Sequence, residues 1–392
     1  MTVTMTIGGE SGAGARDHTP SRHAPSTRTG SSIGGSFLPL EYECRPSDWY
    51  IGRIPWRHRN RSATLPNYRP RTSAELKKAG VTRVGLRDNR VKVDDGMYVH
   101  VNHLLPATTD SDFPRARRVH PATLALAHLI LHPGRIATGF AAASFYGMRY
   151  FVDEELLAFL TSTGTRRTGA PDHVLLHPTR LLDLHRSTAV PVHEDHRKLK
   201  CADAHTTLSH MLESVSVPDA LREQRWNVPD LSRIRSHLTP DFIRCVQVSD
   251  ACHQSIGNVS PADPRKLRVP GGLDVMFAAS VLGSTDVGAE SPQETLLRLA
   301  VNDLAPGMRS QIPVFKEDGK LLTVSDLGWG ERGLHLMYDG VHHRQREQRD
   351  HDSEVLAALQ HGGGRVIRVT AGNLASMAKI EKLRERVVGA LE

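Results

Sequence analysis

Residues 291–304 read SPQETLLRLAVNDL, which has the composition of a helix start followed by one apolar helix face. Ser291 suits the N-cap, Pro292 suits the first helical position, and Glu294 stands three residues after the cap, where its carboxylate can bond back to the cap amide. Apolar residues then recur at helical spacing: Leu296, Leu297, Ala300, Val301 and Leu304. We therefore expect a capped amphipathic helix to open the last domain.

Three strands are expected after this helix. Apolar segments 311–315 and 321–325 flank the dipeptide Asp318-Gly319, and Asp-Gly between two apolar runs is typical of a hairpin turn. Residues 333–339 alternate in hydropathy and predict a third strand. A polar helix that stops at the glycines 362–364, a strand over 365–370 and a last helix with apolar periodicity follow. The order αβββαβα indicates a compact mixed α/β (α+β) sheet domain covered by helices.

This order and its residues resemble the restriction-endonuclease-like PD-(D/E)xK fold. The resembled branch contains the very-short-patch-repair-like endonucleases and the domain-of-unknown-function 559 group. The matching motifs are SPQE at 291–294, Asp326 at the end of the second strand, MYDGVHH at 337–343 and RVIRVT at 365–370. The resemblance implies an endonuclease in which Glu294, Asp326 and Asp339 hold Mg²⁺, with His342 near the attacking water or the leaving oxygen.

Met337 departs from the resembled pattern, because that position carries a glutamate in the family. Mg²⁺ prefers oxygen ligands and usually takes one or two protein carboxylates, so a thioether does not replace the missing one. Asp350 or Asp352 in the following polar segment is an alternative source of that carboxylate. Glu294 and Asp326 also have structural alternatives, as a capping-box residue and an Asx-turn residue. The resemblance therefore implies either a weakened nuclease or a degenerate one.

Residues 72–105 predict a small winged-helix-like module. Thr72 or Ser73 caps a short helix that ends at Gly80, residues 81–87 follow as a second helix, and two short strands flank DDG at 94–96. The phrases AGVTR (79–83) and GMYV (96–99) resemble the N-terminal winged domain of AbiEi-type antitoxins. The resemblance implies that the second helix enters the major groove of DNA. The expected DNA contacts are Arg83, Arg87, Arg90 and Lys92; the alternative is a module that only packs on the next domain.

Composition and pattern divide the remaining chain into a tail, an extension, a middle domain and a last domain. Residues 1–36 are rich in Gly, Ser, Thr and Arg and predict a disordered tail. Residues 37–71 form a basic and aromatic extension that suits either a nucleic acid or a solvated loop. Residues 120–287 predict a middle α/β domain similar to that of the antitoxin proteins, with a strand-to-helix unit at 136–147 and helices near 205–215 and 238–252. Residues 288–392 are the expected restriction-endonuclease-like domain.

Charge and cysteine content narrow the function classes. The net charge of +7 is compatible with a polyanionic partner, the four cysteines form no CxxC pair, and no apolar run approaches the roughly 20 residues of a membrane span. We expect a cytoplasmic protein without a membrane partner. Three functions stay open. The first is an endonuclease-like, nucleic-acid-associated protein of bacterial defence that uses Mg²⁺. The second is a non-catalytic DNA-binding regulator of the AbiEi-type antitoxin kind with a protein partner, and the third is a protein–protein scaffold.

Overall fold

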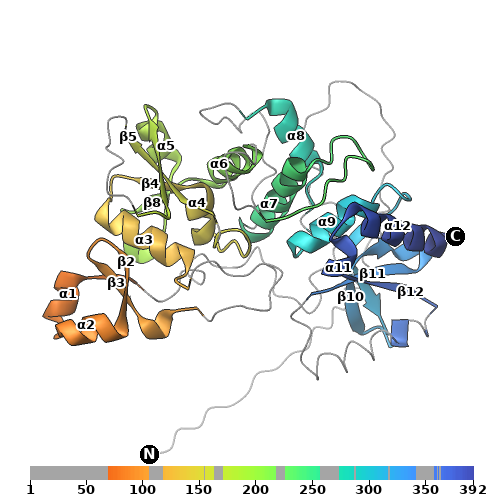
Figure 1. The fold of residues 1–392 in the computed structure, drawn as a ribbon, viewed down its shortest axis with the longest axis horizontal. Coiled ribbons are helices and arrows are strands. Elements are labelled where there is room, and N and C mark those ends of the chain that lie inside the picture. The colour runs from red at the N-terminus through yellow and green to blue at the C-terminus, as the bar shows by residue number, and fades with distance from the viewer. Residues whose placement is uncertain are drawn as a thin grey trace, which may run out of the picture. The chain divides into compact units, whose positions relative to one another are not determined.

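The computed structural model describes residues 69–105, 118–153, 155–162, 171–217, 226–256, 273–286, 288–316, 318–340, 357–359, 361 and 363–392 (Figure 1). These residues form three separate sheets with helices packed on them, which confirms the mixed α+β class. They all belong to the compact unit 37–392. The predictions for the tail 1–36, for residues 37–68, for His342 and for Asp350 and Asp352 lie outside the described residues.

The helix–turn–helix order predicted for residues 72–105 is present. Its elements are β1 (Arg71–Thr72), α1 (Ser73–Lys78), α2 (Arg83–Asn89), β2 (Arg90–Asp94), β3 (Met97–His100) and the 3₁₀ turn Val101–His103, with sheet order β1-β3-β2. Glu75 N donates to Thr72 Oγ1 (3.1 Å) and Thr72 N donates to Glu75 Oε2 (2.8 Å), which forms a capping box on α1. Gly80 adopts a φ of +79°, so the chain turns between the helices without a Cβ penalty.

Helix α2 begins two residues later than its apolar pattern predicts. Thr82 is its N-cap, because the Thr82 hydroxyl accepts a hydrogen bond from Gly85 N at 3.1 Å. The hydroxyl thereby satisfies one of the free amides of the first turn. The second helix of the module consequently starts at Arg83, and its first turn carries a basic side chain.

The middle region forms a five-stranded sheet of order β6-β5-β4-β8-β7. Its elements are α3 (Pro121–Leu131), β4 (Ile136–Thr138), α4 (Gly139–Phe145), β5 (Leu157–Ser162), β6 (Val174–Thr179), α5 (Leu182–Thr188), β7 (Val190–Pro191), the 3₁₀ turn Glu194–His196, β8 (Lys200–Cys201) and α6 (Ala204–Ser216). Apolar residues of the hairpin β2–β3 share one buried cluster with α3. Buried His128 of α3 also bonds Asp94 of β2, with 2.9 Å between Nδ1 and Oδ2.

The C-terminal sheet has the strand order β12-β11-β10-β9. The elements around it are α7 (Pro240–Ile256), α8 (Val275–Gly283), α9 (Pro292–Val301), β9 (Arg309–Phe315), β10 (Leu321–Trp329), the 3₁₀ turn Gly330–Arg332, β11 (Leu334–Asp339), β12 (Arg365–Thr370), α11 (Ala371–Leu374) and α12 (Met377–Leu391). Strands β9, β10 and β11 are antiparallel neighbours, and β12 runs parallel to β11. The strand order therefore places β10, with Asp326, and β11, with Met337 and Asp339, in the middle of this sheet.

Helix α7 packs against α9 although a boundary near Gly288 is predicted between them. Residues on both sides of Gly288, among them Val246, Leu282 and Leu297, belong to one buried apolar cluster. Asp250 of α7 accepts hydrogen bonds from Thr295 Oγ1 (2.7 Å) and Arg298 Nη2 (3.0 Å) of α9. The core around the C-terminal sheet thus includes residues upstream of Gly288, and the domain limits stay predictions.

Across the part of the chain that the structure describes, no helix combines the length and the apolar character needed to span a membrane.

Candidate functional site

The first candidate site is a pair of carboxylates at α9 and β10. Glu294 lies in the first turn of α9 and is 7% exposed. Its carboxylate accepts hydrogen bonds from Glu290 N (2.8 Å) and Ser291 Oγ (2.9 Å), and Glu294 N donates to Ser291 Oγ (3.2 Å). Burial raises the pKa of Glu294, and the negative charge of Asp326 raises this pKa further. The structure thus brings Glu294 and Asp326 within electrostatic reach of each other.

Met337 and Asp339, the other two positions of the predicted nuclease motif, lie on β11. Asp326 Oδ2 accepts a hydrogen bond from Tyr338 N at 2.6 Å, and the Asp339 carboxylate accepts one from Arg368 Nη2 of β12. The β10–β11 register ends at the pair Leu327–Leu336, and Asp326 and Met337 each lie one residue beyond this pair at its open end. Side chains alternate between the two faces of a strand, so Asp326 and Met337 lie on the face opposite to that of the two leucines.

This set of donors does not fit a Mg²⁺ site. Mg²⁺ requires oxygen ligands that converge on one point in near-octahedral geometry. Here the Asp339 carboxylate pairs instead with Arg368 of the neighbouring strand β12. Within the described ranges, no three His, Cys, Asp or Glu residues form a group that could hold a metal ion. The predicted role of His342 and the prediction of Mg²⁺ stay untested.

Gln311 is a neighbour of this pair that the sequence did not indicate. Its side chain is buried, and its Nε2 lies 3.5 Å from Glu294 Oε2. Its φ of +55° falls in the left-handed region, which is uncommon for a residue other than glycine. Its Oε1 is buried and has no hydrogen-bond partner among the described residues. A glutamine within a strand carries no sequence pattern that predicts such a conformation.

The second candidate site is the outer face of α2. No residue of this helix is buried, and Val84 is 59% exposed. Arg83 and Arg87 are four residues apart and project from the same side of the helix, with Val84 beside Arg83. Arg87 also forms a surface ion pair with Asp88, with 2.8 Å between Nε and Oδ1. The face combines two guanidinium groups with an apolar side chain.

The remaining predicted DNA contacts have different surroundings. Lys92 pairs with Asp95 across 3.2 Å at the tip of the β2–β3 hairpin, whereas the neighbouring Asp94 is buried against His128. The Asp95 carboxylate thus neutralises the charge of Lys92. Arg90 instead lines an open groove of 700 Å³ whose basic lining residues are Arg69, Arg71, Lys78, Arg90, His100 and His103. One acid, Glu75, also lines the groove and pairs with Arg69 at 3.0 Å. The groove therefore carries an excess of positive charge.

Comparison with known proteins adds little to this geometry. No model of a protein family matches the chain, and no curated protein matches it. Among solved structures, the chain is similar to the crystal structure of RV2827C protein from Mycobacterium tuberculosis, with 16% identity over 63% of this chain and 82% of that chain. The TM-score of 0.30 is too low for this likeness to carry an argument.

Proposed function

We propose that this protein binds double-stranded DNA through its helix–turn–helix module and does not cut it. One observation carries the proposal: α2 follows a short turn after α1, buries none of its residues and exposes Arg83, Val84 and Arg87. In helix–turn–helix proteins, side chains from the start of the second helix contact base edges in the major groove. Arginine suits guanine, and an apolar side chain suits the thymine methyl group.

The basic groove supplies the backbone contacts of the proposed complex. Arg71, Lys78 and Arg90 line it with the two histidines of the 100–103 segment. Cations that neutralise phosphates release counterions from DNA, which makes binding depend steeply on salt. In this proposal α2 contacts bases and the groove contacts phosphates, whereas Lys92 is neutralised by Asp95 and contributes less.

The surroundings of the carboxylates support the non-cutting version. The Glu294 carboxylate accepts hydrogen bonds from Glu290 N and Ser291 Oγ, Asp339 forms an ion pair with Arg368, and Met337 stands where the resembled nucleases have a glutamate. A thioether does not replace a carboxylate as a ligand of Mg²⁺. The proposal thus favours a regulator of the AbiEi-type antitoxin kind, with a protein partner and a cytoplasmic location, over a working endonuclease.

Selection from a random duplex library in EDTA tests this function. We expect enrichment of a short sequence, because each base-edge contact by arginine favours its base by about 1–3 kcal/mol. Arg83→Ala and Arg87→Ala should relax the preference at individual positions, whereas Arg90→Ala should weaken binding to all sequences alike. Failure to enrich any duplex, or retention of full preference in both α2 variants, would contradict the proposal.

A further inference from the structure

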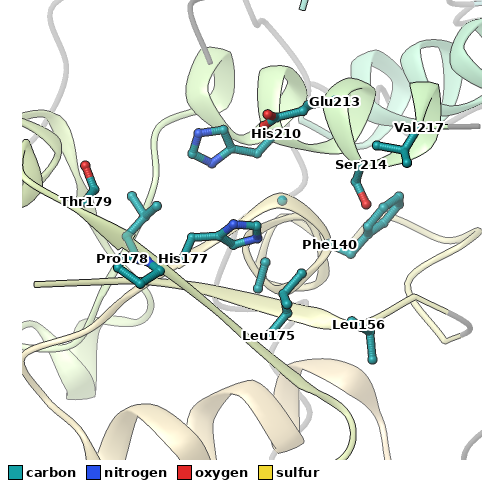
Figure 2. Close-up of a pocket in the computed structure, with 13 residues that line it drawn as sticks. Phe140, Leu156, Leu175, His177, Pro178, Thr179, His210, Glu213, Ser214 and Val217 are labelled. Carbon is teal, nitrogen blue, oxygen red and sulfur yellow. The ribbon is translucent and has the colours of Figure 1, made fainter. Parts of the chain in front are cut away.

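A pocket of 370 Å³ lies in the middle region, and its described lining includes no residue of α2 or of the carboxylate pair (Figure 2). Its walls come from α4, α6 and the neighbouring strands β5 and β6. Much of the wall is apolar, with Phe140 from α4, Ala158 and Leu160 from β5 and Leu175 from β6. Pockets for small organic molecules have volumes of roughly 300–1,000 Å³ and walls of this kind. The size and the walls therefore suit a small organic molecule.

Two imidazoles face the pocket. Figure 2 shows His177 and His210 directed into the same space, with 6.4 Å between their ring centroids. His210 is held by a hydrogen bond between its Nδ1 and Thr138 Oγ1 (2.5 Å). Burial, with smaller contributions from His177 and His185, lowers the pKa of His210 to about 3. The ring of His210 is therefore neutral at pH 7 and offers a flat surface without positive charge.

Glu213 gives the pocket its electrostatic character. It is half-buried on α6, and burial raises the pKa of its carboxylate. In the described part of the chain, neither a cation nor a hydrogen-bond donor pairs with this carboxylate. None of the thirteen residues that line the pocket is Lys or Arg. Among the described residues of the wall, a phosphate or carboxylate group on a ligand would therefore meet no Lys or Arg, whereas an ammonium group would pair with a half-buried anion.

We propose that this pocket binds a small organic amine with a flat apolar body. The ammonium group pairs with Glu213, and the body lies against Phe140, the apolar strand residues and the imidazole of His210. The ammonium group forms a charge-assisted pair with the half-buried carboxylate, and the flat apolar body displaces water from the apolar wall. This binding activity is separate from the proposed DNA binding.

Tryptamine and indole-3-acetate form a matched pair of probes, because they share a ring and carry opposite charges. Titration calorimetry on the full chain at pH 7.5 should show binding of tryptamine and at least about tenfold weaker binding of indole-3-acetate, since a charge-assisted hydrogen bond contributes about 1.5–3 kcal/mol. Glu213→Gln should weaken tryptamine binding by about tenfold or more, whereas the exposed-helix control Glu385→Gln should not. Ala158→Leu should abolish binding by filling the pocket.

The DNA affinity of each variant reports whether the chain is still folded and separates this inference from the proposed function. Equal affinity of wild-type protein for both probes would overturn the inference, because it would indicate an apolar pocket without charge selection. Absence of tryptamine binding to the wild-type protein at millimolar concentration would also overturn it, as would unchanged affinity in folded Glu213→Gln.

Discussion

Replacement of Arg298 by methionine tests whether α7 belongs to the core of the C-terminal sheet. Arg298 Nη2 lies 3.0 Å from Asp250 Oδ2, and both side chains are buried, at 8% and 2% exposed. Asp250 also accepts a hydrogen bond from Asp286 N at 2.7 Å. Arg298→Met keeps most of the side-chain volume but leaves Asp250 buried near a second carboxylate. The loss should therefore come from an uncompensated charge rather than from a cavity.

The size of the destabilisation follows from the distance between the two charges and from their burial. Two unit charges 3.0 Å apart attract by about 5.5 kcal/mol at an effective dielectric constant of 20. Removing one partner of a buried pair usually costs about 3–5 kcal/mol. We therefore expect the free energy of unfolding of Arg298→Met to be about 3–5 kcal/mol lower than that of the wild type at pH 8.

The loss of unfolding free energy in Arg298→Met should increase with pH. Burial raises the pKa of Asp250 from its usual 3.8 to about 7, and Arg298 opposes this rise. A raised pKa means that the folded state binds the proton more tightly, so stability falls as pH rises from about 4 towards the folded pKa. Without Arg298 the pKa rises further and the fall continues above pH 7, by at most about 1.4 kcal/mol per pH unit. The loss of stability in the variant should thus be smaller at pH 5 than at pH 8.5, by at most about 2 kcal/mol.

Urea unfolding at pH 5, 7 and 8.5, followed by circular dichroism, measures this difference. Arg368→Met is the matched control, because Arg368 pairs with Asp339 but is 46% exposed. An exposed pair of this kind contributes about 0–1 kcal/mol. A loss in Arg298→Met that is equally large at pH 5 and pH 8.5, or no larger than in the control, would refute the buried-pair reasoning.

Two further substitutions test the C-terminal sheet and its carboxylates. Gly328→Ala should lower the free energy of unfolding by about 3 kcal/mol or more, because its Cβ would lie 2.2 Å from Leu334 O; Gly389→Ala, with open space around it, should have no such cost. Met337→Glu should place a third carboxylate near Asp326 and Glu294, so Mg²⁺ should raise the melting temperature of this variant but not that of the wild type.

Each of these expectations has a clear contrary result. Equal urea midpoints for Gly328→Ala and Gly389→Ala would show that the β10–β11 contact is looser than described. Mg²⁺-dependent nicking of supercoiled plasmid by the wild-type protein, lost in Asp326→Ala, would establish a working nuclease and contradict the non-cutting proposal. Met337→Gln is the control for Met337→Glu, because it changes polarity without adding charge.

Local patterns predicted a large part of the fold. The Ser291 N-cap, the turn at Asp318-Gly319 and the strand-to-helix unit β4–α4 depend on residues close together in the chain, and each is present. The Glu294 carboxylate, however, bonds the amide of Glu290 rather than the expected amide of Ser291. The position of α2 was shifted by two residues because the Thr82 cap competes with the apolar pattern. A single side chain determines where such a cap forms, and the spacing of apolar residues does not reveal it.

Long-range contacts account for what the sequence did not predict. The pairing of Asp250 with Arg298 joins residues 48 positions apart, and the bond between Thr138 and His210 joins residues 72 positions apart. The left-handed backbone of Gln311 depends on neighbours that pack against it rather than on its own preference. The amine pocket likewise arises from α4, α6 and two strands whose proximity exists only in the folded chain.

The binding of duplex DNA in EDTA, followed by fluorescence anisotropy over a range of salt concentrations, tests the central claim most directly. The account predicts binding without a divalent metal, an affinity that falls steeply with salt, and a loss of at least about tenfold in the double variant Arg83→Ala/Arg87→Ala. The control Lys382→Ala/Arg386→Ala, which removes two exposed cations from α12, should bind like the wild type. Equal affinities for both double variants, or no binding by the wild-type protein, would contradict the account.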